Sequence, residues 1–272
     1  MPGRQYVISL IAILILALYL FPIYWMYVTS FKPISELSQY PPTLWPQHPE
    51  SNHVEIFENF AVARYFWNSI VITAGVTFIT VVVGTGTAYG LALVRNRFVE
   101  VVLFTILLLQ ALPSSLMATP LFVLFNVVGL LQSPRLAVIL AATAKSLPFF
   151  IVICRAAFLQ IPKELRDAGL VDGNSRVGVF FRIALPLARN SILITAVLIA
   201  IQAMGEYVFS LSFIAQIELQ PLTLGLNNFI GANQTDWNGV MVFASILVTP
   251  ILFVFVFLQR RIISGLTAGA LK

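Results

Sequence analysis

Long apolar stretches alternate with short polar segments along the whole chain. Six of these stretches are long enough to cross a bilayer as helices, because the hydrocarbon core requires about 20 mostly apolar residues. They comprise residues 6–29, 66–94, 99–125, 136–158, 192–215 and 240–258. The pattern predicts an all-α integral membrane protein with six transmembrane helices, forming one transmembrane domain over residues 1–272.

The composition agrees with a membrane environment. Of the 272 residues 59% are hydrophobic and only 10% are charged, whereas a soluble domain carries about 25% charged residues. The net charge of +5 comes from cations in the segments between apolar stretches, which excludes nucleic acid as the expected partner. The only histidines, His48 and His53, share one polar loop and Cys154 is the only cysteine, so we expect no metal site.

Lysine and arginine are distributed unevenly between the two sides of the membrane. The N-terminus, the even-numbered loops and the C-terminus together contain 12 of the 16 cations, counting Arg155 at the end of the fourth stretch with the loop that follows it. The odd-numbered loops contain three, and Lys145 lies inside a span. Because cytoplasmic loops are enriched in cations, this bias places both termini in the cytoplasm.

The loop at residues 159–190, on the cationic side, has the pattern of a helical hairpin. Gly173 predicts the end of a first helix, because glycine readily adopts the left-handed conformation that follows a helix. Asn174 or Ser175 can cap a second helix, and Pro186 is expected to end or kink it. One face of that second helix is predicted to hold Val177, Phe180, Phe181 and Ala184. The pattern leaves two interpretations open, a hairpin lying on lipid and a hairpin that docks on a soluble protein.

Within this loop the chain resembles a known family. Permeases of bacterial ABC importers share a signature of Glu-Ala-Ala, three residues, Gly, nine residues, Ile, one residue and Leu-Pro. Here residues 167–169 read Asp-Ala-Gly, and they are followed at the same spacing by Gly173, Ile183 and residues 185–186, Leu-Pro. Aspartate replaces the first glutamate and Gly169 replaces the second alanine. Over nearly the whole chain the resemblance points to the smaller permease of the maltose-type sugar importers, with matching segments at 29–33, 221–226, 235–237, 259–261 and 265–272.

The resemblance implies a fold and a set of partners. The fold is that of a type I ABC importer permease, with the loop as its cytoplasmic coupling helix. The implied partners are a second permease, a homodimeric ABC ATPase that holds ATP and Mg, an extracytoplasmic sugar-binding protein and the lipid of a bacterial inner membrane. The small Ala168 and Gly169 are expected to let the helix approach the ATPase closely. The implied ATPase-coupling residues are Asp167, Ala168, Gly169, Leu170, Asp172, Gly173, Ile183, Leu185 and Pro186.

Polar side chains inside the spans are a second group of candidates. A charge at the bilayer centre costs about 2.5–3.5 kcal/mol on insertion scales, so such groups tend to face the protein interior. Lys145 and Glu206 can either form a structural ion pair with each other or line a translocation path. Gln110 and Gln202 are further candidates for such a path.

The loop after the fifth stretch is a candidate for contact with the binding protein. The residues proposed for that contact, by family resemblance, are Asn233, Asp236 and Trp237. An aromatic residue that anchors a helix at the membrane interface is a simpler account of Trp237 alone.

The motifs also separate function classes. The chain lacks the Gly-x-x-x-x-Gly-Lys-[Ser/Thr] phosphate loop, so it needs a separate ATPase and no cofactor of its own. An intramembrane enzyme would need paired carboxylates or a Ser/His pair at membrane depth, and no catalytic residue is expected. A stand-alone secondary transporter of small polar solutes is the alternative to the permease of an ATP-driven importer for sugars or related glycosides.

Overall fold

The structure of the chain is a computed structural model that describes residues 2–59, 62–94, 96–230 and 235–270. The described residues are mainly helical, with one isolated β-bridge between Ile230 and Thr235. The chain forms two compact units, one made of Met1–Phe66 and Leu224–Leu252, the other of Trp67–Thr223 and Phe253–Lys272. Each unit is described by itself.

The first unit contains α1 (Pro2–Ser30), α2 (Ile34–Leu37), α3 (His53–Asn59), η4 (Leu226–Phe229) and the beginning of α13 (Trp237–Ala270). Asn238 joins these segments, because its side-chain amide donates to the Lys32 carbonyl at 2.7 Å and its Oδ1 accepts from Asn52 at 3.1 Å. A second contact joins α1 to α13, where the hydroxyls of Tyr27 and Thr249 lie 2.7 Å apart.

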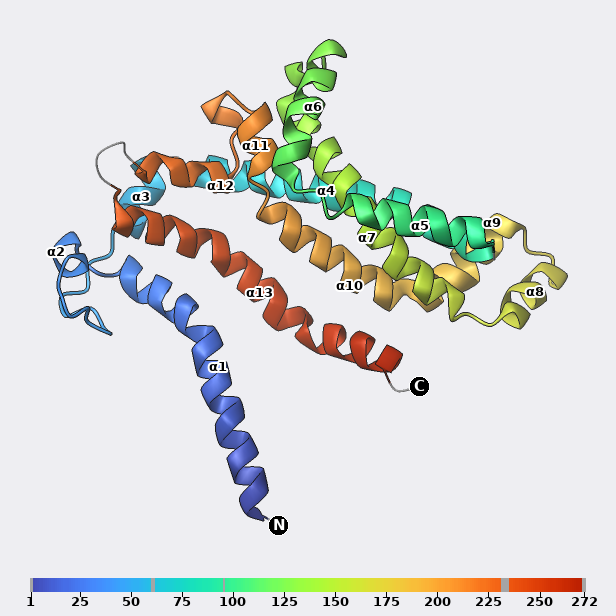
Figure 1. Cartoon of the computed structure of the whole chain (residues 1–272), viewed down its shortest axis with the longest axis horizontal. Helices are drawn as coiled ribbons and strands as arrows, with labels where there is room; N and C mark the ends of the chain where they lie inside the picture. Colours follow the sequence, from blue (N-terminus) through green and yellow to red (C-terminus); the bar gives the residue numbers. More distant parts are fainter. Residues whose placement is uncertain (1, 60–61, 95, 231–234, 271–272) are drawn as a thin grey trace. The chain divides into compact units, whose positions relative to one another are not determined.

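The second unit carries the candidate sites. After most of α4 (Val62–Leu93) it contains α5 (Arg97–Leu109), α6 (Ser114–Val127), η1 (Leu130–Gln132), α7 (Pro134–Leu159), α8 (Lys163–Val171), α9 (Arg176–Val179), the π-helical turn η2 (Phe180–Ala184), α10 (Leu185–Met204), α11 (Val208–Phe213), η3 (Ile217–Leu219) and the start of α12 (Leu222–Gly225). Its core lies along α7, which packs against α10 and buries Val138, Phe150 and Cys154. The hairpin of α8 and α9 projects beyond the ends of α7 and α10 (Figure 1).

The prediction of an all-helical membrane fold is confirmed. Within the described residues, five helical segments are long and apolar enough to cross a membrane. These are Tyr6–Ser30, Val62–Leu93, Pro134–Leu159, Arg176–Met204 and Trp237–Phe257. They correspond to five of the six predicted stretches.

The third predicted stretch, residues 99–125, is not one continuous helix. It consists of α5 with 13 residues and α6 with 14, separated by a break at residues 110–113. Pro113 cannot donate a backbone hydrogen bond, and it disfavours helical geometry at Leu112. Pro113 itself is extended, with φ −65° and ψ 144°. Figure 1 shows that α6 leaves the direction of α5 at this break.

The fifth predicted stretch, residues 192–215, is displaced along the chain. The continuous helix begins at Arg176, inside the polar loop, and ends at Met204. Gly205 follows it as the C-terminal cap, and a separate helix, α11, begins at Val208. The hydropathy of residues 208–215 therefore reflects a second short helix.

Candidate functional site

The loop between α7 and α10 folds as the predicted helical hairpin. Gly173 has φ +85°, in the left-handed region. Its N–H donates to the Leu170 carbonyl at 3.1 Å, while the Asn174 N–H donates to the Gly169 carbonyl at 3.1 Å. These two bonds define a Schellman motif, which satisfies carbonyls that the end of a helix leaves without partners. Ser175 then caps α9, since its hydroxyl accepts from the Gly178 N–H at 3.0 Å.

Gly169 has a different place from the one expected. It is buried inside the hairpin, and a Cβ at this position would lie 2.4 Å from Ile183 Cδ1 and 3.3 Å from Val179 Cγ2. Its small size therefore permits α8 to pack on the second arm of the same hairpin. The expectation that it serves close approach to another protein does not fit this geometry.

The outer surface of the hairpin combines apolar and acidic side chains. Asp167, Ala168 and Asp172 are exposed. Leu170 is exposed beside them, and Val171, at the apex, has 87% of its surface exposed. The hairpin thus presents an apolar apex flanked by carboxylates.

The second arm of the hairpin differs from the predicted helix in its buried face. Val177 and Phe181 are exposed, whereas Val179 and Ala184 are buried. Val177 and Val179 lie in α9, before the π-helical turn at Phe180–Ala184, so this turn bears only on Phe181 and the residues after it. In the turn the Leu185 N–H donates to the Phe180 carbonyl five residues earlier. A π-turn inserts one residue and rotates the face that follows. Pro186 lies directly after it, near the start of α10, and does not end the continuous helix.

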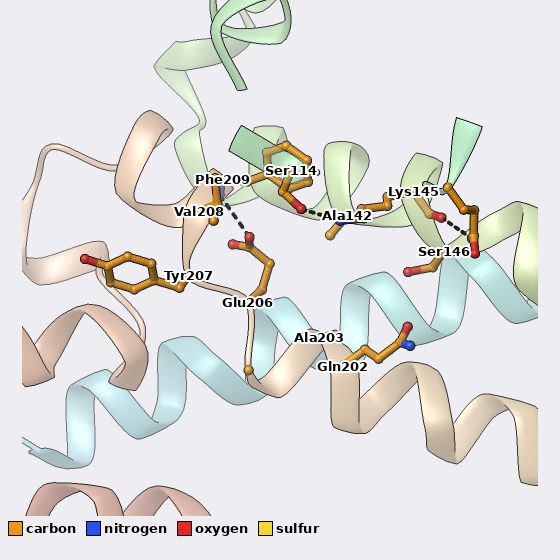
Figure 2. Close-up of a pocket in the computed structure, with 12 residues that line it drawn as sticks. Ser114, Ala142, Lys145, Ser146, Gln202, Ala203, Glu206, Tyr207, Val208 and Phe209 are labelled. Carbon is orange, nitrogen blue, oxygen red and sulfur yellow. Dashed lines mark hydrogen bonds between the residues drawn. The ribbon is translucent and has the colours of Figure 1, made fainter. Parts of the chain in front are cut away.

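The four polar candidates from the spans line one pocket in the second unit. Gln110, Lys145, Gln202 and Glu206 border a volume of about 440 Å³. Figure 2 shows Lys145 on α7, and Gln202 and Glu206 at the end of α10 and just beyond it. The pocket forms where α5 and α10 both stop, so that backbone breaks and polar side chains occur together.

Lys145 and Glu206 bind separate partners rather than each other. The Lys145 ammonium donates to the Ser114 hydroxyl. The Glu206 carboxylate accepts from the N–H groups of Phe209 and Ser210 and from the Ser210 hydroxyl, each at 2.9 Å. Glu206 thus satisfies amides that the start of α11 leaves without partners. Among the described residues, no ion pair joins Lys145 to Glu206, which removes that interpretation of the two charges.

Three pocket residues with polar side chains were not predicted, namely Ser114, Ser146 and Tyr207. Ser114 directly follows Pro113, so the proline that breaks the third stretch was the available signal. Ser146 adjoins Lys145, but neighbours in a helix point in different directions, so sequence alone could not place it. Tyr207 adjoins Glu206 between α10 and α11, where the direction of the chain depends on the fold.

The candidates for contact with a binding protein lie at the start of α13. Asp236 caps that helix, because its Oδ1 accepts from the Gly239 N–H at 3.0 Å. Trp237 is 58% exposed, and Asn233 lies outside the described residues.

Lys32, within the matching segment 29–33, is only 2% exposed. Its ammonium donates to the Thr43 carbonyl and lies 4.6 Å from the centre of the Trp25 ring. A carbonyl and an aromatic face thus stabilise this buried cation. The contacts of Lys32 therefore stabilise the fold of the first unit.

Comparison with known proteins places the chain among transport proteins. A family model described as "Binding-protein-dependent transport system inner membrane component" matches residues 81–267. The chain is 34% identical over 260 residues to the probable ABC transporter permease protein YurM of Bacillus subtilis (strain 168), covering 93% of this chain and 83% of that protein. It is 30% identical over 269 residues to the trehalose/maltose transport system permease protein MalG of Thermococcus litoralis, covering 96% and 94%.

A solved structure shares the fold. It is a bacterial ABC transporter involved in the import of the acidic polysaccharide alginate, and one of its chains superposes with a TM-score of 0.78. The superposition covers 95% of this chain and 96% of that one, at 18% identity.

Proposed function

The chain belongs to the family of binding-protein-dependent transport system inner membrane components, and we propose that it is one permease subunit of an ATP-driven importer for sugars or related glycosides. In this proposal the chain forms half of a translocation path across the inner membrane, with both termini in the cytoplasm. It works with a second permease, a homodimeric ATPase that binds ATP and Mg, and an extracytoplasmic sugar-binding protein. The trehalose/maltose function in the name of one relative supports the sugar class.

The observation that carries this proposal is the exposed apex of the hairpin. An apolar apex on the cationic, cytoplasmic side must be covered by lipid or by protein. The acidic Asp167 and Asp172 flank this apex, and an anionic membrane surface offers no partner to carboxylates at the apex. A protein partner with cationic and apolar groups therefore fits the apex itself, whereas the cations Lys163, Arg166, Arg176 and Arg182 belong to the rest of the hairpin. We therefore propose that Asp167, Ala168, Leu170 and Asp172 contact the ATPase.

The remaining signature residues support that contact from inside the hairpin. Gly173 forms the turn, and Gly169 lets α8 pack closely on Ile183. Leu185 and Pro186 continue the second arm into α10. A hairpin held in this way can transmit a displacement of its apex as one body, which the coupling of ATP hydrolysis to transport requires.

The pocket is the proposed contribution of this chain to the path. It combines amide, hydroxyl and charged groups in a region where α5 and α10 are interrupted. Helix breaks at membrane depth are tolerated where the backbone is buried in protein or lines a water-filled cavity. Gln110, Lys145, Gln202 and Glu206 are therefore the residues that we propose to line it. In the first unit, Asp236 and Trp237 are proposed to contact the binding protein.

Co-purification of the ATPase tests the docking role. We expect the affinity-tagged wild-type chain, produced with its cognate partner subunits, to retain the ATPase, and Val171→Asp to lose it, because a charge then occupies the centre of the apolar contact. Val54→Asp is the matched control, since Val54 is 67% exposed on α3, outside the hairpin. Equal ATPase recovery for Val171→Asp and wild type would mean that the apex is not the docking surface.

A further inference from the structure

A cluster of three aromatic rings holds the base of the hairpin to the neighbouring helices of the second unit. Phe158 on α7 lies 5.3 Å from Tyr89 on α4 and 6.4 Å from Phe180 in the π-helical turn, measured between ring centres. Tyr89 and Phe180 are 4.9 Å apart. The cluster therefore joins α4 and α7 to the second arm of the hairpin, but it contains no residue of α5.

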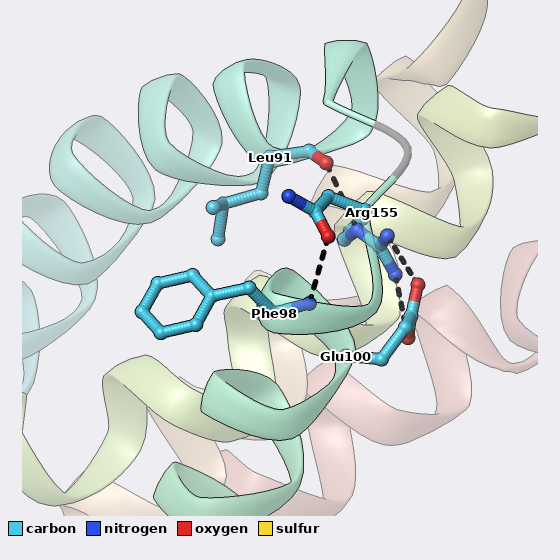
Figure 3. Close-up of polar contacts among 5 residues, drawn as sticks. Leu91, Phe98, Glu100 and Arg155 are labelled. Carbon is cyan, nitrogen blue, oxygen red and sulfur yellow. Dashed lines mark hydrogen bonds and ion pairs between the residues drawn. The ribbon is translucent and has the colours of Figure 1, made fainter.

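A polar contact adds α5 to this base. Arg155, one turn before Phe158 on α7, donates from Nη2 to Glu100 Oε1 at 2.7 Å and from Nη1 to Glu100 Oε2 at 3.4 Å. Its Nε donates to the Leu91 carbonyl at 3.1 Å. Figure 3 shows the guanidinium between the end of α4 and the start of α5. We refer to Leu91, Glu100 and Arg155 as the arginine clamp.

Each contact of the clamp has a physical reason. Leu91 lies in the last turn of α4, where carbonyls have no partner within the helix. Glu100 lies in the first turn of α5, where the helix dipole favours a carboxylate. The Arg155 side chain is 9% exposed and that of Glu100 is 63% exposed. A paired contact between guanidinium and carboxylate is both strong and directional, so one buried cation fixes three helices.

At its other end α5 reaches the pocket. Gln110 follows the last residue of α5, and its Nε2 donates to the Lys145 carbonyl of α7 at 2.7 Å. The 13 residues of α5 span about 20 Å. This helix is therefore bonded to α7 at both ends, through the clamp near the hairpin and through Gln110 at the pocket.

We propose that Arg155 and Glu100 are positioning residues that couple movement of the hairpin to the pocket through α5. The inference rests on the proposed function, because it takes the hairpin to be the part that an ATPase moves. Displacement of the hairpin moves the end of α7 from which it projects. The clamp makes the start of α5 follow that movement, and α5 carries the displacement to the break at residues 110–113.

A cysteine-labelling experiment tests this coupling in the assembled importer. Leu112→Cys places a thiol in the break, where Leu112 is exposed, and the native Cys154 is buried and contributes little background. The rate of labelling by a water-soluble maleimide is measured in proteoliposomes without nucleotide and with ATP plus vanadate. We expect this rate to change at least about fivefold between the two states, the lower end of typical coupling between sites.

In the same Leu112→Cys background, Glu100→Ala is expected to reduce the ratio of the labelling rates in the two nucleotide states to about 1. ATPase recovery and ATP hydrolysis should stay at wild-type values. Glu100→Asp, which keeps the carboxylate, should restore part of the ratio. Arg97→Ala is the matched control, because Arg97 is exposed on α5 in the same groove, and it should keep the full ratio.

Several results would overturn the coupling role. One is an unchanged ratio of labelling rates in Glu100→Ala. Another is a labelling rate of Leu112→Cys that is the same with and without nucleotide when Arg155 and Glu100 are both present. Loss of the ATPase from Glu100→Ala would assign the pair to assembly instead. Failure of the wild-type chain to retain any ATPase would refute the proposed function itself, which is a separate and distinguishable result.

Discussion

Substitution of Gly173 tests the turn on which the hairpin depends. The residue has φ +85°, and a Cβ at this position would meet no atom within 4 Å. The cost of a side chain is therefore conformational rather than steric. For an L-residue the left-handed conformation costs about 1–2 kcal/mol, of which about 0.4–1 kcal/mol is offset because alanine has fewer unfolded conformations than glycine.

Gly173→Ala is thus expected to destabilise the closed turn by about 1 kcal/mol, which is roughly a fivefold increase in its opening. Gly173→Val should be more severe, because a β-branched residue is a strong outlier in this region. Gly173→Asn is the matched control, since asparagine tolerates the left-handed conformation.

Hydrogen exchange over residues 163–186 of the purified complex measures this opening directly. The Asn174 amide is the informative position, because its bond to the Gly169 carbonyl exists only while the turn is closed. Exchange should be fastest in Gly173→Val, intermediate in Gly173→Ala and near wild type in Gly173→Asn, and ATP-driven transport should fall in the same order. If the alanine and asparagine variants exchange equally, the left-handed conformation is not what the glycine supplies.

Three further substitutions probe the hairpin and the pocket. Gly169→Val should separate the hairpin arms and lower transport, and Ile183→Ala should partly rescue it by removing the atom that lies 2.4 Å from the new Cβ; an unrescued double variant would argue against internal packing. Glu206→Gln keeps an acceptor oxygen but removes the charge, and should weaken the start of α11 by about 0.3–1 kcal/mol, seen as faster hydrogen exchange over residues 208–213; unchanged exchange would show that the charge does not hold this helix. Asp167→Lys should lower ATPase recovery, and an unchanged yield of complex with unchanged ATP hydrolysis would remove Asp167 from the docking surface.

The hairpin shows how far local sequence signals reach. Gly173 and Ser175 have local effects, because a positive φ and a helix cap depend on residues within a few positions. The sequence placed the turn at Gly173 and narrowed the cap to Asn174 or Ser175, and the structure has Ser175 as the cap. The burial of Gly169 depends on the second arm of the hairpin, which packs against it. The outward direction of the Phe181 side chain depends on a π-turn, which leaves no signal in the hydropathy of the sequence. Neither could be read from helical periodicity.

The third apolar stretch shows a different limit. Residues on both sides of Pro113 are equally hydrophobic, so a hydropathy window continues through the break. The proline was visible in the sequence, but many membrane helices contain a proline without dividing, as α7 does at Pro148. Whether a proline kinks or ends a helix depends on whether other groups satisfy the freed backbone, which is a tertiary property.

Arg155 illustrates the same dependence for charge. Counted along the chain, it is one of the cations on which the predicted orientation rests. In the structure it is a buried residue of α7 that bonds two other helices. The partners, Leu91 and Glu100, are 64 and 55 residues away in sequence, so only the fold reveals that this cation does more than bias topology.

The bonds around the pocket limit what this chain can offer a transported solute. The Glu206 carboxylate is occupied by the start of α11, and Gln110 and Lys145 are joined to a carbonyl and a hydroxyl. The side chains of Gln202 and Ser146, by contrast, make no hydrogen bond to the described residues, and they border the same volume. If the pocket forms half of a path, as proposed, the amide of Gln202 and the hydroxyl of Ser146 are the polar groups most open to the hydroxyls of a sugar. The Lys145 ammonium keeps further N–H donors beyond its bond to Ser114, but that bond fixes its position. A path must release what it admits, and a lining whose charged groups already have protein partners binds a solute less tightly than free charges would.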